Sequence, residues 1–197
     1  MIKIVLFVIT TVFFGCGTVP QPHDPSDANN WIIHRASVSP YDRWQAFAKI
    51  AIQTPQYSGS VRLDWKQINN DFSIILSGPL GIQNVLLTGD NDEAILQYNG
   101  ERKVGSPSEL VNDIVGIPFK FDVLTYWLRG IPSPHLIQTN LLTYPDGQAY
   151  KFEQAGWSLK FENYKPTPFG SLPRKILGYK NEQSFKLVVT KWSKIKI

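Results

Sequence analysis

The side chains that most often carry out chemistry are few and scattered in this chain of 197 residues. The three histidines, His23, His34 and His135, lack the short spacing of metal ligands, and a single cysteine can form neither an internal disulfide nor a multi-cysteine metal site. The carboxylates fall on polar strand positions and in turns, so no pair is suited to acid–base catalysis. Nucleophile-elbow, Walker, Gly-x-Gly-x-x-Gly and His-Glu-x-x-His motifs are missing from the sequence. We therefore expect no enzymatic activity, no metal and no cofactor.

The one reactive residue in an informative position is Cys16. Lys3 precedes an apolar run over residues 4–14, which is too short for the roughly 20 residues that span a bilayer and is typical of a signal peptide. Gly15 followed by Cys16 resembles a bacterial lipobox, in which the cysteine is acylated and becomes the new N-terminus. The sequence thus predicts a signal peptide over residues 1–15 and a lipid anchor on Cys16. An ordinary signal peptide, or a signal anchor with an incidental cysteine, is the alternative.

The segment that follows the cysteine predicts a spacer. Residues 17–30 are rich in Pro, Asp and Asn and contain almost no hydrophobic side chains, so residues 16–30 are expected to form a lipidated, flexible tether. Gly17 occupies the position where inner-membrane lipoproteins usually carry Asp, and this resemblance favours the outer membrane. Residues 31–197 then form a single domain, because a hydrophobic content of 43% is enough to bury one core.

From Arg43 onward the domain shows the period of two that is typical of half-buried strands. Segments that alternate in this way cover residues 61–66, 72–77, 150–153, 157–162 and 185–190. Turn-forming residues separate such segments at residues 67–70, 89–92, 99–100 and 145–147. Asn99-Gly100 in particular favours a tight hairpin. The pattern predicts antiparallel strands with one apolar and one polar face.

Two helices are expected to interrupt the strands. A capping box begins at Ser106, and Gly116 ends the apolar stripe that follows it. Asp122 is expected to cap the second helix, which Gly130 ends. A short helix over residues 31–38 is expected before the first strand. The composition of elements predicts an α+β fold, in which two or three helices lie on the apolar face of a curved antiparallel sheet.

Several short patterns, in their order and spacing behind the lipobox, resemble the LolB family of outer-membrane lipoprotein receptors. The patterns are Trp31 with His34, the strand ending at Trp65, Ser77-Gly78-Pro79-Leu80-Gly81, Gly116-Ile117-Pro118, Trp127 with Gly130-Ile131-Pro132, and Lys191-Trp192. The likeness runs from Trp31 to the end of the chain. The loop departs from the family pattern at Gly78, where a polar residue such as Asn is expected.

The resemblance implies an incomplete antiparallel barrel whose apolar mouth is closed by helices. Its hydrophobic cavity receives the acyl chains of a lipoprotein that the periplasmic carrier LolA hands over, and the receptor then inserts that lipoprotein into the outer membrane. No nucleotide is used, and the receptor acts as a monomer anchored by its own lipid and facing the periplasm. An envelope lipoprotein with an unrelated small-ligand-binding or scaffold role is the alternative.

The apolar faces of the strands and of the second helix supply the candidates for the cavity wall: Trp65, Leu124, Trp127 and Leu128. An apolar wall with few polar groups suits acyl chains, although any one of the tryptophans is equally compatible with an ordinary filled core.

Leu80 lies between Pro79 and Gly81 in a turn between two strands, where neither neighbour shields its side chain. The side chain could fold back onto its own sheet, whereas the family resemblance assigns it to membrane insertion.

Four lysines near the C-terminal end, Lys186, Lys191, Lys194 and Lys196, could meet anionic headgroups or simply form a solvated face. Because the signal peptide directs the chain out of the cytoplasm, nucleic acid is not an expected partner.

Overall fold

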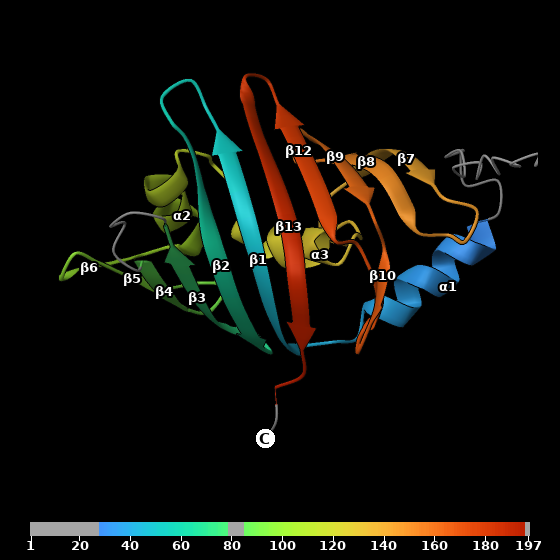
Figure 1. The fold of residues 1–197 in the computed structure, drawn as a ribbon, viewed down its shortest axis with the longest axis horizontal. Helices are drawn as coiled ribbons and strands as arrows, with labels where there is room; N and C mark the ends of the chain where they lie inside the picture. The colour runs from blue at the N-terminus through green and yellow to red at the C-terminus, as the bar shows by residue number, and fades with distance from the viewer. Residues whose placement is uncertain (1–27, 79–84, 196–197) are drawn as a thin grey trace, which may run out of the picture.

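The computed structural model describes residues 28–78 and 85–195, which form a curved antiparallel sheet with helices on its concave side (Figure 1). Cys16, Pro79, Leu80 and Gly81 lie outside the described residues.

Eleven strands build the main sheet, and all neighbouring strands in it are antiparallel. They are β1 (Arg43–Gln53), β2 (Ser58–Ile68), β3 (Asp71–Ser77), β4 (Val85–Gly89), β5 (Ala94–Tyr98), β6 (Glu101–Gly105), β7 (Gln138–Thr143), β8 (Ala149–Gln154), β9 (Trp157–Glu162), β12 (Lys175–Lys180) and β13 (Gln183–Ser193). The spatial order is β6-β5-β4-β3-β2-β1-β13-β12-β9-β8-β7. The edge strands β6 and β7 do not pair with each other, so the sheet forms an incomplete barrel. Two short strands, β10 (Lys165–Thr167) and β11 (Gly170–Leu172), pair separately.

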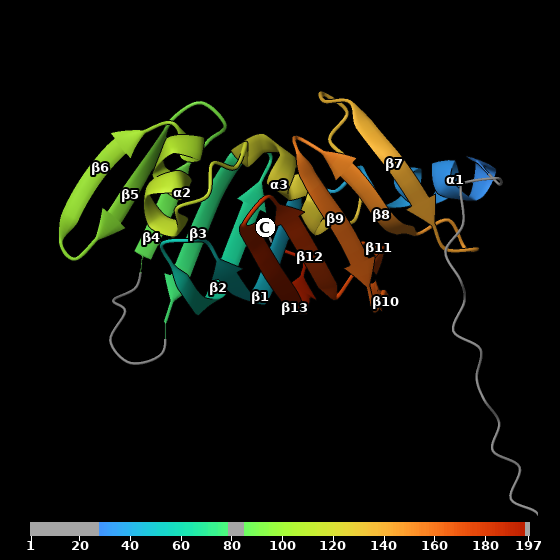
Figure 2. The same ribbon diagram turned by 90° about the horizontal axis from the view of Figure 1, so that it is seen from above.

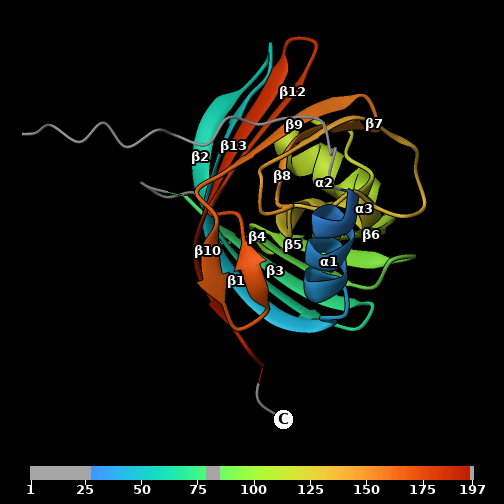
Figure 3. The same ribbon diagram turned by 90° about the vertical axis from the view of Figure 1, so that its right-hand side faces the viewer.

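The order of the strands dictates where two of the helices lie. The chain leaves the sheet at one edge, β6, and re-enters it at the opposite edge, β7. The segment between them carries α2 (Pro107–Val115) and α3 (Phe121–Leu128), which therefore cross the concave face (Figures 2 and 3). The remaining helix, α1 (Ala28–Val38), packs beside β11 instead. The predicted α+β fold is confirmed, with α2 and α3 covering the concave side.

The period-two segments form strands whose apolar side chains point inward. In β9, Trp157, Leu159 and Phe161 are buried, while the residues between them are half-buried. The hairpin between β5 and β6 turns at Asn99 and Gly100, which have φ angles of 52° and 81°. Two consecutive positive φ angles are the type I′ geometry that matches the twist of paired strands.

The two covering helices begin in different ways. The capping box of α2 is confirmed: the Glu109 amide donates to Ser106 Oγ at 3.3 Å, and Gly116 ends the helix with a left-handed φ of 68°. The prediction that Asp122 caps α3 is wrong, because the N-cap residue is Lys120 and it offers no side-chain cap. Instead, the first-turn amide of Phe121 donates to Ser108 Oγ of α2 at 3.0 Å. A contact between helices thus takes the place of a local cap.

Helix α1 begins at Ala28, three residues before the predicted start, so residues 28–30, which the sequence analysis assigned to a tether, are helical. The extra turn is held by the body of the domain, since Asn30 Nδ2 donates to the carbonyl of Pro145 at 3.1 Å. A composition rich in Asn and Asp gives no indication of such a contact with a distant residue.

Candidate functional site

An apolar cavity of about 110 Å³ lies between the concave face of the sheet and helices α2 and α3. This inner cavity is lined by Ile50, Ile52, Val61, Leu63, Trp65, Ile74, Leu76, Leu87, Val111, Ile114, Val115, Phe119, Phe121, Leu124, Trp127, Leu128, Ile176, Phe185 and Leu187. Every lining residue is aliphatic or aromatic, and none is charged. The central strands and both helices contribute to the wall, so the fold described above creates the cavity.

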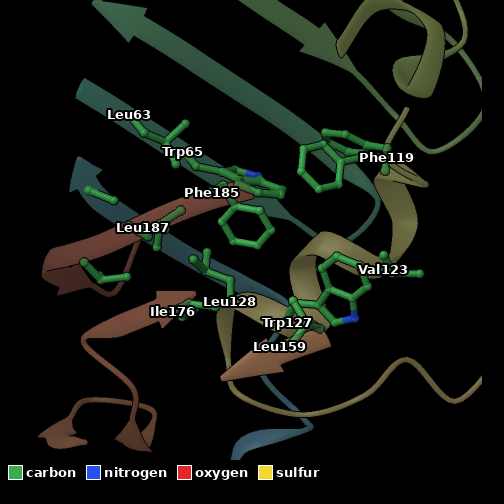
Figure 4. Packing of buried hydrophobic residues seen from close by; sticks show 14 of the residues in the cluster. Leu63, Trp65, Phe119, Val123, Trp127, Leu128, Leu159, Ile176, Phe185 and Leu187 are labelled. Carbon is green, nitrogen blue, oxygen red and sulfur yellow. The ribbon is translucent and has the colours of Figure 1, made fainter. Parts of the chain in front are cut away.

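All four residues that the sequence suggested for the cavity wall line the inner cavity. Trp65 comes from β2, and Leu124, Trp127 and Leu128 come from α3. Figure 4 shows Trp65, Trp127 and Leu128 gathered with Phe185 from β13 around one space. These side chains are therefore brought together from distant parts of the chain.

The two tryptophans present hydrocarbon to the cavity because their only polar groups are bound elsewhere. Trp65 Nε1 donates to Gln67 Oε1 at 3.0 Å, and Trp127 Nε1 donates to Gln154 Oε1 at 2.9 Å. A buried indole N–H that already has a partner needs nothing from a ligand. The wall thus suits a ligand that offers apolar area and no hydrogen bonds.

Gln154, which the sequence analysis did not single out, fixes one side of α3. Its Oε1 accepts from Trp127 and also from the Ser133 amide at 2.9 Å, and its Nε2 donates to the carbonyls of Ser133 and Leu136 at 2.9 and 3.0 Å. This side chain is 2% exposed, with its amide fully bonded. A signal was present in the sequence, since Gln154 continues the inward-facing positions of β8 two residues after Phe152.

Arg129, also missed, holds the C-terminal end of α3. Its Nη1 donates to the carbonyls of Val38, Ser39 and Tyr41 at 3.3, 2.8 and 3.3 Å, and its Nε donates to Thr125 O at 3.0 Å. Burial lowers the pKa of this guanidinium. The cation ties the C-terminal end of α3 to the segment that joins α1 to β1, close to the Trp127–Gln154 hydrogen bond.

A second hollow of about 360 Å³ adjoins the inner cavity. This outer groove is lined by Ile50, Ile52, Tyr57, Gly59, Val61, Leu76, Val85, Leu96, Tyr98, Asp113, Ile114 and Val115. Six of these residues also line the inner cavity: Ile50, Ile52, Val61, Leu76, Ile114 and Val115. The rim carries Tyr57 and Tyr98, each 43% exposed. The two spaces thus share a wall, part of which is α2.

The outer groove borders the strand ends that flank the predicted insertion loop. Leu76 of β3 pairs with Val85 of β4, and both side chains line the groove. The loop residues Pro79, Leu80 and Gly81 belong to the segment 79–84, whose placement lies outside the described residues, as does Cys16.

Within residues 28–78 and 85–195, no group of three His, Cys, Asp or Glu side chains is arranged to hold a metal ion. Of the helices in this part of the chain, none combines the length and the apolar character needed to cross a membrane.

Comparison with known proteins gives matches over most of the chain. A family described as "Outer membrane lipoprotein LolB" matches residues 42–192. A relative named outer-membrane lipoprotein LolB, from Stutzerimonas stutzeri, is 33% identical over 184 residues, which cover 90% of this chain and 88% of the relative. A protein of the same name from Ectopseudomonas mendocina is 29% identical over 96% of this chain and 95% of its own length.

Solved structures share the fold at low sequence identity. A LolA superfamily protein from Nitrosomonas europaea superposes with a TM-score of 0.56 at 13% identity, covering 86% of this chain and 94% of that protein. A DUF1329 family protein from Desulfovibrio piger gives a TM-score of 0.52 at 8% identity, covering 87% and 94% of the two chains. These structures show the same half-barrel architecture.

Proposed function

The chain belongs to the LolB family of outer-membrane lipoproteins, and from this we propose that it receives lipoproteins from a LolA-type periplasmic carrier and inserts them into the outer membrane. The single observation that carries the proposal is the inner cavity, whose wall contains only apolar side chains. A saturated acyl chain needs apolar area and no polar partner, which is what this wall offers. The protein acts in this scheme as a monomeric receptor and not as an enzyme.

The same observation disfavours an unrelated small-ligand-binding role. Sites for small polar molecules carry a few polar groups that fix orientation. In the inner cavity the nearest such groups, the indole N–H groups of Trp65 and Trp127, are already bonded to Gln67 and Gln154.

The size of the cavity indicates that its wall moves when an acyl chain enters. Ligand pockets typically measure about 300–1,000 Å³, and the inner cavity measures about 110 Å³. Helix α3 is held at its C-terminal end by Gln154 and Arg129, whereas α2 lies at the edge of the sheet against β5 and β6 and is joined to the start of α3 through Ser108. We therefore assign the movement to α2, which separates the inner cavity from the outer groove through Ile114 and Val115.

The anchor and the insertion loop complete the scheme. Cys16 carries the lipid after removal of residues 1–15, and the segment up to the start of α1 at Ala28 serves as the tether. Leu80 contacts the membrane during release. The outer groove supports a role of the loop in release, because Leu76 and Val85 line the groove at the strand ends nearest the loop.

A transfer assay tests the function. The chain from Gly17 onward is mixed with a carrier loaded with a lipoprotein, and the lipoprotein is followed by affinity capture of either protein. The expected result is passage of the lipoprotein to this chain without nucleotide. A folded chain that accepts no lipoprotein from any carrier would contradict the proposal. Intact-mass analysis of the membrane-extracted protein checks the anchor, since it should show loss of residues 1–15 and a gain of acyl mass.

A further inference from the structure

The convex face of the sheet is turned toward the viewer in Figure 1. Its strands carry a group of exposed cations that the cavity does not explain. This basic patch consists of Lys49, Arg62, Lys66, Lys186 and Lys191, all of them exposed. They lie on the outward positions of β1, β2 and β13, next to inward residues such as Leu63 and Leu187. In the strand register, Lys49 lies directly opposite Arg62, and Lys186 lies opposite Ala51 and hence diagonal to Lys49.

This arrangement places like charges against each other without compensation from the described chain. Like charges directly opposite each other destabilise a strand pair. No carboxylate of residues 28–78 or 85–195 forms an ion pair with Lys49 or Arg62. Asp64 lies on the same face, but its Oδ1 accepts from Gln45 Nε2 at 2.7 Å. The repulsion would be relieved by an anionic partner.

Other lysines of the same sheet do form ion pairs. On β9 and β12, Lys160 and Lys175 each lie 2.7 Å from a carboxylate oxygen of Glu162. The convex face thus pairs its cations with a carboxylate on β9 and β12. Within the described residues no ion pair forms with the cations of β1, β2 and β13, although Lys191 lies over the Phe47 ring at 5.8 Å.

An aliphatic stripe continues the basic patch toward the edge of the sheet. It consists of Ile75, Leu86, Ile95 and Val104, one residue from each of the strands β3 to β6. Ile75 pairs with Leu86 and Ile95 pairs with Val104, so they lie in two rows on the outward face. Val104 is 50% exposed. Arg62 lies opposite Ser77 and Lys66 lies opposite Ser73, each two residues from Ile75, while Asp64 lies directly opposite Ile75. The cations and the stripe are therefore adjacent, with one carboxylate between them.

We propose that this convex face docks on the surface of a membrane that contains anionic phospholipid. The basic patch would meet phosphate groups, and the aliphatic stripe would meet the boundary between headgroups and acyl chains. Cations beside an apolar strip fit such a surface better than either feature alone. Each cation near an anionic leaflet strengthens binding by about fivefold.

The docked orientation has a geometric consequence for the cavity. Leu76 and Val85 line the outer groove, while their neighbours Ile75 and Leu86 belong to the docking face. The groove therefore reaches the same strand ends that the docking face brings to the membrane. The docking itself does not depend on acceptance of lipoproteins, which is measured in solution without vesicles.

The test uses the lipidated full chain reconstituted in vesicles of phosphatidylcholine, with or without phosphatidylglycerol. Amine acetylation is followed lysine by lysine with mass spectrometry. We expect acetylation of Lys49, Lys66 and Lys186 to slow about fivefold or more when phosphatidylglycerol is present. Lys120, which is exposed in the segment between α2 and α3, is the internal reference and keeps its rate. Equal rates in both vesicles at Lys49 and Lys186 overturn the proposal.

The variant Lys49→Glu separates docking from folding. It replaces a like-charge pair by an opposite-charge pair with Arg62, so thermal stability is expected to stay equal or rise. Protection of Lys186 by anionic vesicles should nevertheless be lost. Lys120→Glu makes the same change in net charge and should keep this protection. Retained protection in Lys49→Glu overturns the proposal, and so does protection that appears only when the carrier protein is added to uncharged vesicles.

Discussion

The aromatic ring of Phe185 lies directly against the backbone of Gly178, its partner across β12 and β13. A Cβ atom at Gly178 would lie 2.1 Å from Cε1 of that ring. Phe185 also lines the inner cavity, so the absence of a side chain at position 178 sets the position of part of the cavity wall.

We expect Gly178→Ala to push the Phe185 ring into the inner cavity. The protein should lose about 1–3 kcal/mol of stability, because overpacking forces side chains off their preferred positions. A fluorescent fatty-acid probe should bind more weakly, as measured by titration. Gly105→Ala is the control, since its added Cβ would come no closer than 3.5 Å to another residue. Probe affinity equal to that of the unmodified chain would show that the ring moves elsewhere.

Leu128→Trp should fill the inner cavity from α3. Leu128 is 3% exposed and lines the cavity, so the larger ring has some space to occupy. Transfer of a lipoprotein from its carrier should fall more than the free energy of unfolding does. Leu172→Trp enlarges a fully buried residue outside that wall, and there the loss of stability should dominate. The idea fails if Leu128→Trp accepts lipoproteins at the normal rate.

Gln154→Leu removes the acceptor of the Trp127 indole and the bonds to the Ser133 and Leu136 backbone. The loss of a partner for the indole N–H by itself lowers the free energy of unfolding by about 1–3 kcal/mol. Urea denaturation should therefore show a clear loss of stability. Gln53→Leu, at an exposed strand end, should change stability little. A stable Gln154→Leu protein would mean that α3 is held mainly by Arg129.

Acidification should weaken the fold through His34, which packs edge-on against Tyr164 with 5.9 Å between ring centroids. Burial lowers the pKa of His34 below its ordinary value of 6.5, with Asp146 opposing the effect. The unfolded chain then binds a proton that the folded chain rejects, so stability is full above about pH 6.5 and falls as the pH drops toward the lowered pKa. His34→Phe should make the melting temperature flat between about pH 5.5 and 7. A slope unchanged by this substitution would assign the effect to another group.

Leu80→Asp should separate acceptance from insertion. Burying one Leu side chain in lipid contributes about 1.5–3 kcal/mol, so its loss should slow insertion about tenfold or more while acceptance from the carrier is kept. Ile137→Asp, at a position that is 88% exposed, is the matched control and should alter neither step. Loss of acceptance with normal insertion of the accepted lipoprotein would show that Leu80 does not act at the release step.

The sequence predicted those features whose causes are local. Alternation in β9 and the capping box at Ser106 depend on neighbours within a few residues, and both are confirmed. Trp65 and the apolar stripe of α3 line the inner cavity because the inward-facing residues of a sheet meet the helix that covers it. Their contact with an acyl chain stays a prediction. The start of α3 was predicted wrongly, because the Phe121 amide is bound by the side chain of Ser108, 13 residues earlier, and not by a local cap.

Features that join distant parts of the chain could not be predicted in this way. Arg129 binds the carbonyl of Ser39, 90 residues away, and Gln154 binds Trp127, 27 residues away. Nothing near either residue in the sequence indicates these partners, which only the folded chain brings close. The size of the cavity is equally non-local, since it depends on how closely Phe185 can approach Gly178.

The pairing of β1 with β13 at the centre of the sheet has a consequence for how the protein is made. The first and last described strands pair at the centre of the sheet, so one backbone edge of β1 has no partner until β13 is present. A chain whose central contacts join its distant ends folds slowly and exposes hydrophobic surface meanwhile. Truncation before β13 therefore removes the middle of the sheet and not merely an edge.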